Sequence, residues 1–255
     1  MNNIFKGKNG PLMIAEIGGN HEGDFNYAKK LVHLACNTKV DVIKLQVYYP
    51  DTLVNEIIDP VRYNHFKKFI LTKDQHIELA EICLRNNKKY LASVWDIGAY
   101  DWIDMYSNFY KIGSGDLTAL TLIDEIIKKK KPIVLSTGLS TFQEIEETVK
   151  YIISNNKLYD DPNMLAVLQC TSMYPTEDTD VNLLVIDQFK KSFNYEIGYS
   201  HHSFGDLPLL IADLEEDIET LSSFPGHQDG FFRSSAGECF TPLGLIAKYS
   251  VSGSW

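Results

Sequence analysis

The sequence has few cysteines, fewer basic than acidic residues, and no long apolar run. Its four cysteines lie far apart in 255 residues, with no C-x-x-C pair, so we expect buried reduced thiols and no zinc or dithiol site. Lys and Arg number 24 against 34 Asp and Glu, and the net charge of -10 disfavours binding to nucleic acid or an anionic membrane. Neither a secretory signal nor a membrane span is recognisable. We therefore expect a cytoplasmic protein.

The pattern of apolar residues indicates a globular α/β chain. Hydrophobic residues make up 44% of it, enough for a buried core. Short β-rich runs alternate with amphipathic segments, as in βα units around a parallel sheet. Helices over 72–87 and 141–155 begin with Thr72 and Thr141, each followed by Gln or Glu at capping-box spacing. Strands are predicted over 12–17, 41–47, 90–94, 109–112, 132–136, 165–170 and 195–200.

Seven successive strands in a chain of this length favour a (β/α)8 TIM barrel. An open, doubly wound sheet is the alternative, weakened because no G-x-G-x-x-G follows the first strand. We expect the barrel domain to cover residues 1–221, and residues 222–255 to form an atypical Ser/Gly-rich segment in which basic residues nearly vanish. The eighth strand and the C-terminus are thus expected to be atypical or incomplete.

Polar residues end every predicted strand, which in a barrel is where chemistry occurs. Lys44 and Lys111 stand out, because a lysine flanked by apolar strand residues is rarely tolerated unless paired. Two lysines and several hydroxyls in an acidic chain predict a local site for an anion such as phosphate. Glu16 would pair with Lys44, either as a purely structural partner or while also binding substrate hydroxyls.

Two adjacent histidines, His201 and His202, follow the seventh strand. On an extended chain their side chains point to opposite sides, so only one would face the site. A divalent metal ligand and an ordinary capping or surface role are both open for that residue. His21, in the loop after the first strand, would face substrate or solvent.

Six motifs follow one another along the chain at the ends of these strands: 14–24 (IAEIGGNHEGD), 43–46 (IKLQ), 110–116 (YKIGSGD), 133–138 (IVLSTG), 172–175 (SMYP) and 198–202 (GYSHH). In this order they resemble the sialic acid synthase (N-acetylneuraminate synthase) family, which includes legionaminic and pseudaminic acid synthases and spore-coat polysaccharide proteins. The resemblance covers residues 12–205.

The resemblance implies a metal-dependent condensation of phosphoenolpyruvate with the aldehyde form of an N-acylated hexosamine similar to N-acetylmannosamine. The products would be a nonulosonic acid and phosphate, with Mn²⁺ or Mg²⁺ polarising the aldehyde oxygen. A homodimer is possible. Motif by motif, the resemblance assigns phosphoenolpyruvate to Lys44, Ser93, Lys111, Ser114, Ser136 and Ser200, the sugar to Glu16, Gln46 and Tyr174, the metal to His202, and catalysis to Glu16, Lys44 and Lys111.

The chain departs from the family pattern near the metal. His201 replaces an Asp, and Leu221 stands where the second metal-binding His belongs. His201, Glu219 or His227 would have to replace that ligand. The family's C-terminal antifreeze-like domain, which helps form its dimer, is expected to be missing.

Two other functions therefore stay open. One is a non-catalytic or impaired remnant that binds an anion or sugar. The other is a barrel aldolase that forms a Schiff base through Lys111. The second is disfavoured, because such a lysine needs a desolvated or cationic setting and a hydroxyl-rich cradle is expected around it.

Overall fold

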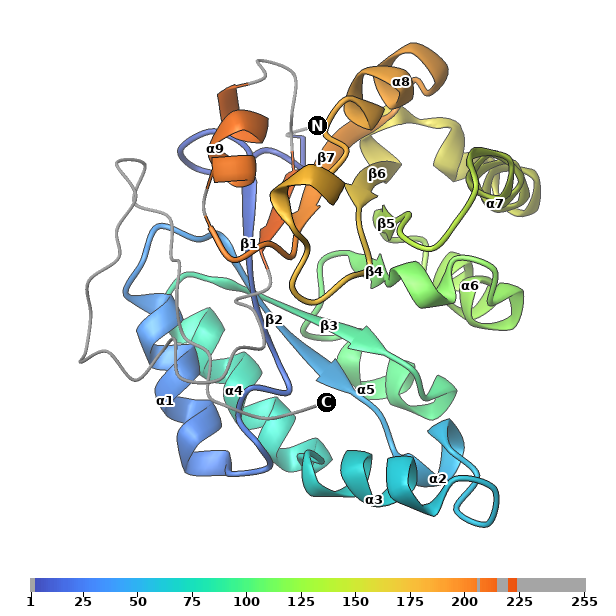
Figure 1. Cartoon of the computed structure of the whole chain (residues 1–255). Coiled ribbons are helices and arrows are strands. Elements are labelled where there is room, and N and C mark those ends of the chain that lie inside the picture. Colours follow the sequence, from blue (N-terminus) through green and yellow to red (C-terminus); the bar gives the residue numbers. More distant parts are fainter. Residues whose placement is uncertain (1–2, 206, 215–219, 224–255) are drawn as a thin grey trace.

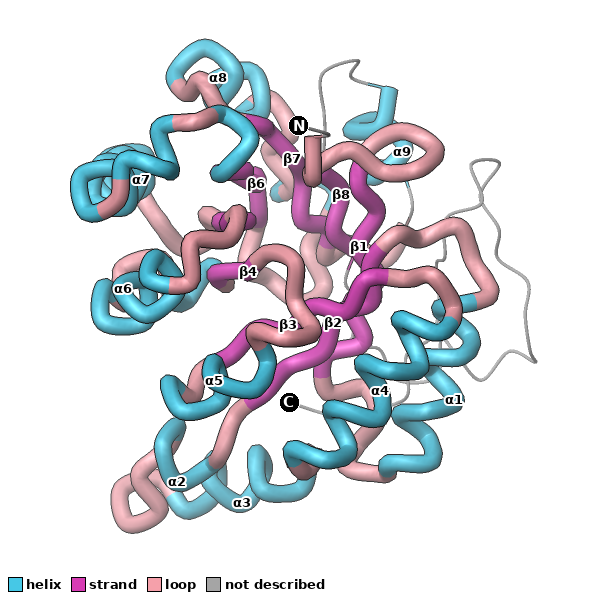
Figure 2. Tube along the Cα trace, turned by 180° about the vertical axis from the view of Figure 1, so that it is seen from behind, coloured by secondary structure: helices cyan, strands magenta, loops and turns pink. Residues whose placement is uncertain are grey.

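The structure is a computed structural model that describes residues 3–205, 207–214 and 220–223. Its strands form one parallel sheet in the order β3-β2-β1-β8-β7-β6-β5-β4, and the helices lie outside this sheet (Figures 1 and 2). The strands are β1 (Leu12–Gly18), β2 (Val42–Val47), β3 (Lys89–Val94), β4 (Tyr110–Ile112), β5 (Ile133–Ser136), β6 (Leu165–Cys170), β7 (Glu196–His201) and β8 (Thr220–Ser223).

The helices between the strands begin close to where the sequence predicts. The side chain of Thr72 caps α4 and that of Thr141 caps α7, and both capping boxes are complete, which confirms the two predicted helix starts. Among the described helices, none is long and apolar enough to cross a membrane. The helices are α1 (Phe25–Cys36), α2 (Pro50–Leu53), α3 (Pro60–Lys68), α4 (Lys73–Arg85), α5 (Tyr100–Ile103), α6 (Leu120–Lys128), α7 (Phe142–Asn155), α8 (Val185–Ser192) and α9 (Leu207–Leu214).

The prediction of an α/β fold with a parallel sheet is confirmed, and all seven predicted strands are present. Strand β8 pairs with β1 and with β7, so the predicted boundary between residues 221 and 222 lies inside a strand. Residues 224–255 of the predicted C-terminal segment lie outside the described residues. Between the described parts of β3 and β4 there is no ladder, only an isolated bridge from Tyr90 to Ser107.

Alternation along the strands divides the sheet into two faces. On β2, Ile43 and Leu45 belong to the large core shared with the helices, whereas Val42 belongs to a second apolar cluster on the inner face. Lys44 and Gln46 continue the inner face toward the carboxyl end of the strand. Strands β1, β3 and β5 share this order of inner residues, apolar first and polar afterwards. The inner apolar cluster consists of Phe5, Leu12, Ile14, Val42, Leu91, Phe109, Val134, Ala166 and Leu168.

Candidate active site

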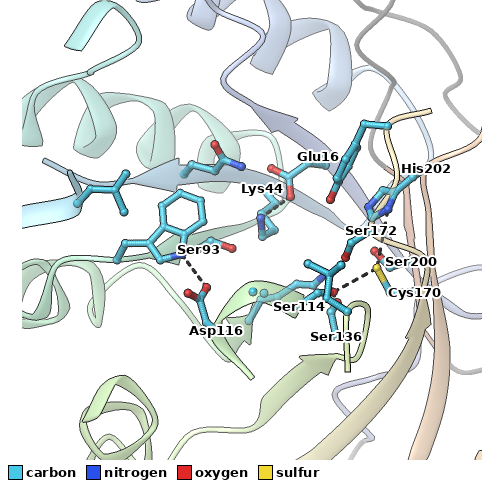
Figure 3. Close-up of a pocket in the computed structure, with 18 of the residues that line it drawn as sticks. Glu16, Lys44, Ser93, Ser114, Asp116, Ser136, Cys170, Ser172, Ser200 and His202 are labelled. Carbon is cyan, nitrogen blue, oxygen red and sulfur yellow. Dashed lines mark hydrogen bonds and ion pairs between the residues drawn. The ribbon is translucent and has the colours of Figure 1, made fainter. Parts of the chain in front are cut away.

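The polar inner residues surround one cavity at the carboxyl ends of the strands (Figure 3). Its volume of about 740 Å³ is in the range of small-molecule sites. All ten residues that the sequence singled out for catalysis or binding line it, so the structure brings the complete predicted set together. They are Glu16, Lys44, Gln46, Ser93, Lys111, Ser114, Ser136, Tyr174, Ser200 and His202.

Glu16 and Lys44 form a buried ion pair across neighbouring strands. Their Cα atoms are register partners in the β1–β2 ladder, and the Lys44 ammonium donates to Oε2 of Glu16. The other carboxylate oxygen, Oε1, is buried and has no hydrogen-bond partner among the described residues. A buried acceptor without a donor is costly, so this oxygen is suited to a hydroxyl group of a ligand.

Lys111 is the second buried ammonium group of the cavity. Its Nζ donates to Oγ of Ser136 on the neighbouring strand at 2.7 Å. Desolvation, and after it the positive charge of Lys44, lowers the pKa of Lys111 to about 8. Cys170 and Glu16 offset only part of this shift, and a bound anion would add a further negative charge that favours the ammonium form.

Ser114 sits between a backbone donor and a thiol. The N–H of Gly138 donates to Ser114 Oγ at 3.0 Å, and the Ser114 hydroxyl donates to Cys170 Sγ at 3.3 Å (Figure 3). A Cβ atom on Gly138 would lie 2.3 Å from Ser172 Oγ and 3.0 Å from Ser114 Oγ. Glycine is therefore needed for this close approach, which fixes the Ser114 oxygen while its proton is donated to Cys170.

His202 lines the cavity (Figure 3). His201 does not line it, which agrees with the expectation that only one of the pair points inward. His202 Nδ1 lies 2.7 Å from the carbonyl oxygen of Thr171, a geometry that fits a proton on Nδ1, and its ring centroid is 4.3 Å from that of Tyr174. His201 Nδ1 lies 3.4 Å from the hydroxyl of Tyr199. Burial lowers the pKa of His201 to about 4, so it is neutral.

The donor set for a divalent metal is incomplete in the described part of the chain. No group of three or more His, Cys, Asp or Glu side chains able to hold an ion is found there. The carbonyl that orients His202 is typical of metal-binding histidines, but one imidazole is not a metal site. Glu219 and His227 lie outside the described residues. Among the described residues, His202 could therefore supply one ligand of a metal site but not a complete site.

One predicted position is wrong. His21 faces neither substrate nor solvent, because it is 2% exposed and does not line the cavity. Its Nδ1 accepts the N–H of Gly23 at 3.0 Å, and burial lowers its pKa to about 4. It acts as a neutral residue that shapes the loop after β1.

Several residues of the cavity escaped the sequence analysis. Cys170 is a buried, reduced thiol as expected, yet it lines the cavity. Burial would raise its pKa, but contact with His202, and then Ser114 and Lys111, lowers it to about 6. Its position two residues after the inward-facing Leu168 is a signal that could have found it.

The sequence also did not predict the outer wall of the cavity, because this wall includes side chains from outside the strands. Trp95 Nε1 donates to Asp116 Oδ2 at 2.6 Å, and both residues line the cavity. Arg62 and Phe66 of α3 complete this side. No strand periodicity marks α3, so its place at the cavity needs the structure.

Comparisons with known proteins agree with the resemblance in the sequence. The model of the NeuB family matches residues 31–213. The chain is 31% identical to N,N'-diacetyllegionaminic acid synthase of Legionella pneumophila, over 79% of this chain and 60% of that protein. It is 30% identical to human N-acetylneuraminate-9-phosphate synthase, over 76% of this chain and 56% of that protein.

A solved structure is similar as well. The N-acetylneuraminic acid (sialic acid) synthetase of Leptospira borgpetersenii, in complex with citrate, superimposes with a TM-score of 0.77 at 28% identity. The match covers 89% of this chain and 78% of that one. Against the curated relatives, the chain spans about three fifths of their length.

Proposed function

The chain belongs to the NeuB family of sialic, legionaminic and pseudaminic acid synthases, and from this membership we propose that it condenses phosphoenolpyruvate with the aldehyde form of an N-acylated hexosamine. The products are a nonulosonic acid and phosphate. The observation that carries the proposal is one cavity that combines two buried ammonium groups, a cluster of serine hydroxyls and a carboxylate oxygen without a partner among the described residues.

The ammonium groups and hydroxyls supply the phosphoenolpyruvate half of the site. Lys111 provides charge close to where Ser114 and Ser136 provide hydroxyl protons. Ser136 Oγ accepts from Lys111, so its own proton would be donated to a ligand. Ser114 Oγ accepts from Gly138, and its proton would turn from Cys170 Sγ to a bound phosphate oxygen. Phosphate oxygens are strong acceptors for such protons. Ser93, Ser200 and Lys44 complete the proposed set.

Glu16 supplies the sugar half. Its Oε1 would accept a hydroxyl of the hexosamine, while Oε2 stays bound to Lys44. Gln46, two residues along β2 from Lys44, and Tyr174, whose ring is half exposed beside His202, would contact the same sugar. The two substrates would thus meet above the Glu16–Lys44 pair.

In the proposed reaction C3 of phosphoenolpyruvate attacks the aldehyde carbon, and a carbon–carbon bond forms. Water adds at C2, and the C2–O bond to phosphate breaks, so the phosphate leaves with the electron pair of that bond. Holding both substrates in one buried cavity lowers the entropic part of the barrier. His202 is the described residue that we propose as a metal ligand; a bound divalent ion would supply Lewis-acid polarisation of the aldehyde oxygen.

The test is phosphate release from phosphoenolpyruvate with N-acetylmannosamine and Mn²⁺, repeated with His202→Ala. We expect release by the wild-type chain and a loss of at least about 100-fold in the variant. His33→Ala is the matched control, because His33 is an exposed histidine of α1. Absence of release with every hexosamine tried would overturn the proposal, and phosphoenolpyruvate binding without turnover would favour a binding-only remnant.

A Schiff-base aldolase is the second candidate, and one observation favours it. Lys111 is buried, and Lys44 helps to lower its pKa to about 8, which is the desolvated, cationic setting that the sequence analysis expected to be missing. The hydrogen bond from Lys111 to Ser136 and the hydroxyls around it still favour anion binding. Borohydride trapping with a carbonyl substrate should leave Lys111 unmodified; an adduct there would reverse the order of the two candidates.

For the fold, we propose a closed (β/α)8 barrel. Support comes from the parallel bridge between Tyr90 of β3 and Ser107 before β4. Leu91 of β3 also shares the inner apolar cluster with Val134 of β5, although β3 lies at the far end of the sheet order. A sheet that brings these residues together must curve strongly.

A further inference from the structure

Among the described connections from a strand to its covering helix, the longest leads to the outer wall of the cavity. Strand β2 ends at Val47 and α4 begins at Lys73, so 25 residues (48–72) lie between them and contain α2 and α3. Such connections are usually only a few residues long, and long ones at this face of a parallel sheet commonly bind substrate. From this segment, Leu53, Arg62 and Phe66 line the cavity.

Arg62 occupies a position that does not favour its own helix. It is the third residue of α3, whose first turn has no acidic residue. The positive end of the helix dipole lies there and disfavours a cation. The backbone N–H of Arg62 is bound by Asp59 at 2.9 Å, and its guanidinium lies 5.6 Å from the centroid of the Phe66 ring. The helix dipole therefore does not favour this charge, and the ring that the guanidinium faces belongs to another residue of the cavity wall.

The guanidinium of Arg62 also forms no ion pair within the described part of the chain. The other described arginine, Arg85 of α4, pairs with Glu81 one turn away. Arg62 is thus a cation that lines the cavity and that no carboxylate of the described residues pairs with.

The other charged residues that line the cavity have polar partners or a proposed role, whereas the Arg62 guanidinium has neither among the described residues. Glu16 neutralises Lys44, and Lys111 belongs to the proposed phosphoenolpyruvate half. Asp116 accepts from the indole of Trp95, and no ion pair joins it to Arg62 in the described part of the chain. Arg62 comes from a helix outside the sheet and is exposed, whereas Lys111 is buried on β4. The cavity therefore has two separate cationic positions, one at its base and one at its mouth.

We propose that Arg62 binds a phosphate ester on the hexosamine, at the end of the sugar away from the aldehyde. This inference rests on the proposed function and narrows its substrate class to phosphorylated hexosamines. A guanidinium pairs with a phosphate through two parallel hydrogen bonds, which gives both affinity and orientation. The apolar wall of Leu53, Phe66 and Trp95 beside it would contact the carbon skeleton of the sugar.

The experiment compares the binding of N-acetylmannosamine and N-acetylmannosamine 6-phosphate to the full chain by titration calorimetry. The wild-type chain should bind the phosphate ester at least about ten-fold more tightly than the neutral sugar. Arg62→Ala should abolish this preference without changing the affinity for the neutral sugar or for phosphoenolpyruvate. Arg62→Lys, which keeps the charge but not the planar fork, should retain part of it. Arg85→Ala is the control and should retain all of it.

Three results with the sugars would overturn the inference: equal affinity of the wild-type chain for both sugars, a preference that survives in Arg62→Ala, or no binding of either sugar. Weaker binding of phosphoenolpyruvate to Arg62→Ala would do the same, because it would assign Arg62 to the other substrate. A different result would contradict the proposed function and leave this inference standing. A preference for the ester that depends on Arg62, without phosphate release from phosphoenolpyruvate, would leave the anion subsite intact and remove the reaction.

Discussion

Proton uptake on phosphoenolpyruvate binding is a direct consequence of the buried Lys111. Desolvation and Lys44 lower its pKa from 10.5 to about 8, so in the free protein about half of the Lys111 side chains are neutral at pH 8 and about nine tenths at pH 9. A bound phosphoenolpyruvate would favour the ammonium form and return the pKa toward 10.5. Binding should then take up about 0.1 proton at pH 7, about 0.5 at pH 8 and about 0.9 at pH 9.

The sign of the pH dependence follows from the same pKa. Below pH 8 the lysine is already protonated, and affinity is insensitive to its titration. Above pH 8 the free protein must gain a proton before it binds, so affinity should fall up to ten-fold per pH unit until about pH 10.5. The depression of the pKa corresponds to about 3 kcal/mol stored against the charged form, which the anion would largely relieve.

The assay is titration calorimetry with phosphoenolpyruvate at pH 7, 8 and 9, in pairs of buffers that differ in ionisation enthalpy. The dependence of the heat on the buffer gives the number of protons exchanged. Lys111→Met should bind about 10-fold to 100-fold more weakly at pH 7 and lose the uptake that grows between pH 8 and pH 9. Uptake that is absent at pH 9 in the wild-type chain, or unchanged in Lys111→Met, would refute the assignment of phosphoenolpyruvate to Lys111.

Two further predictions concern the groups around this lysine. Glu16→Gln leaves the buried Lys44 ammonium without its counter-charge and should lower the free energy of unfolding by about 3–5 kcal/mol, measured by urea unfolding. The double variant with Lys44→Met should recover most of the loss. An unchanged midpoint for Glu16→Gln would contradict the buried pair. Gly138→Ala places a Cβ atom 3.0 Å from Ser114 Oγ and should weaken phosphoenolpyruvate binding about ten-fold in calorimetry. The control is Gly19→Ala, whose Cβ atom would be 3.9 Å from its nearest neighbour and should leave binding unchanged. If Gly138→Ala bound phosphoenolpyruvate as tightly as the wild-type chain, Ser114 would not need this support.

The sequence predicted the strands and the inner residues of the site because both follow from alternation. A buried strand that carries Lys44 between apolar neighbours has only one side on which an ammonium can be tolerated, and the same logic applies to Lys111. Each capping box fixed the start of a helix within one residue, since Thr72 and Thr141 must precede the first turn.

The rest depended on contacts that no local pattern encodes. Arg62 reaches the cavity because α3 packs beside the carboxyl ends of the strands, and nothing in the sequence of α3 specifies that position. His21 was expected to face substrate or solvent because it is polar, but it is buried and hydrogen-bonded within its own loop. Cys170 has the spacing of an inward-facing residue, but a small buried thiol reads as ordinary core until its neighbours Ser114 and His202 are known.

Because inner and outer residues alternate along each strand, the strands of this chain should accept substitutions more readily than insertions or deletions of one residue. Substitutions at inner polar positions exchange one chemistry for another and leave the apolar cluster below untouched. A deletion of one residue within β2 would instead turn Lys44 toward the helices and bring Ile43 or Leu45 into the cavity. Insertions and deletions of single residues should therefore be confined to the loops, and the strands should vary by replacement alone.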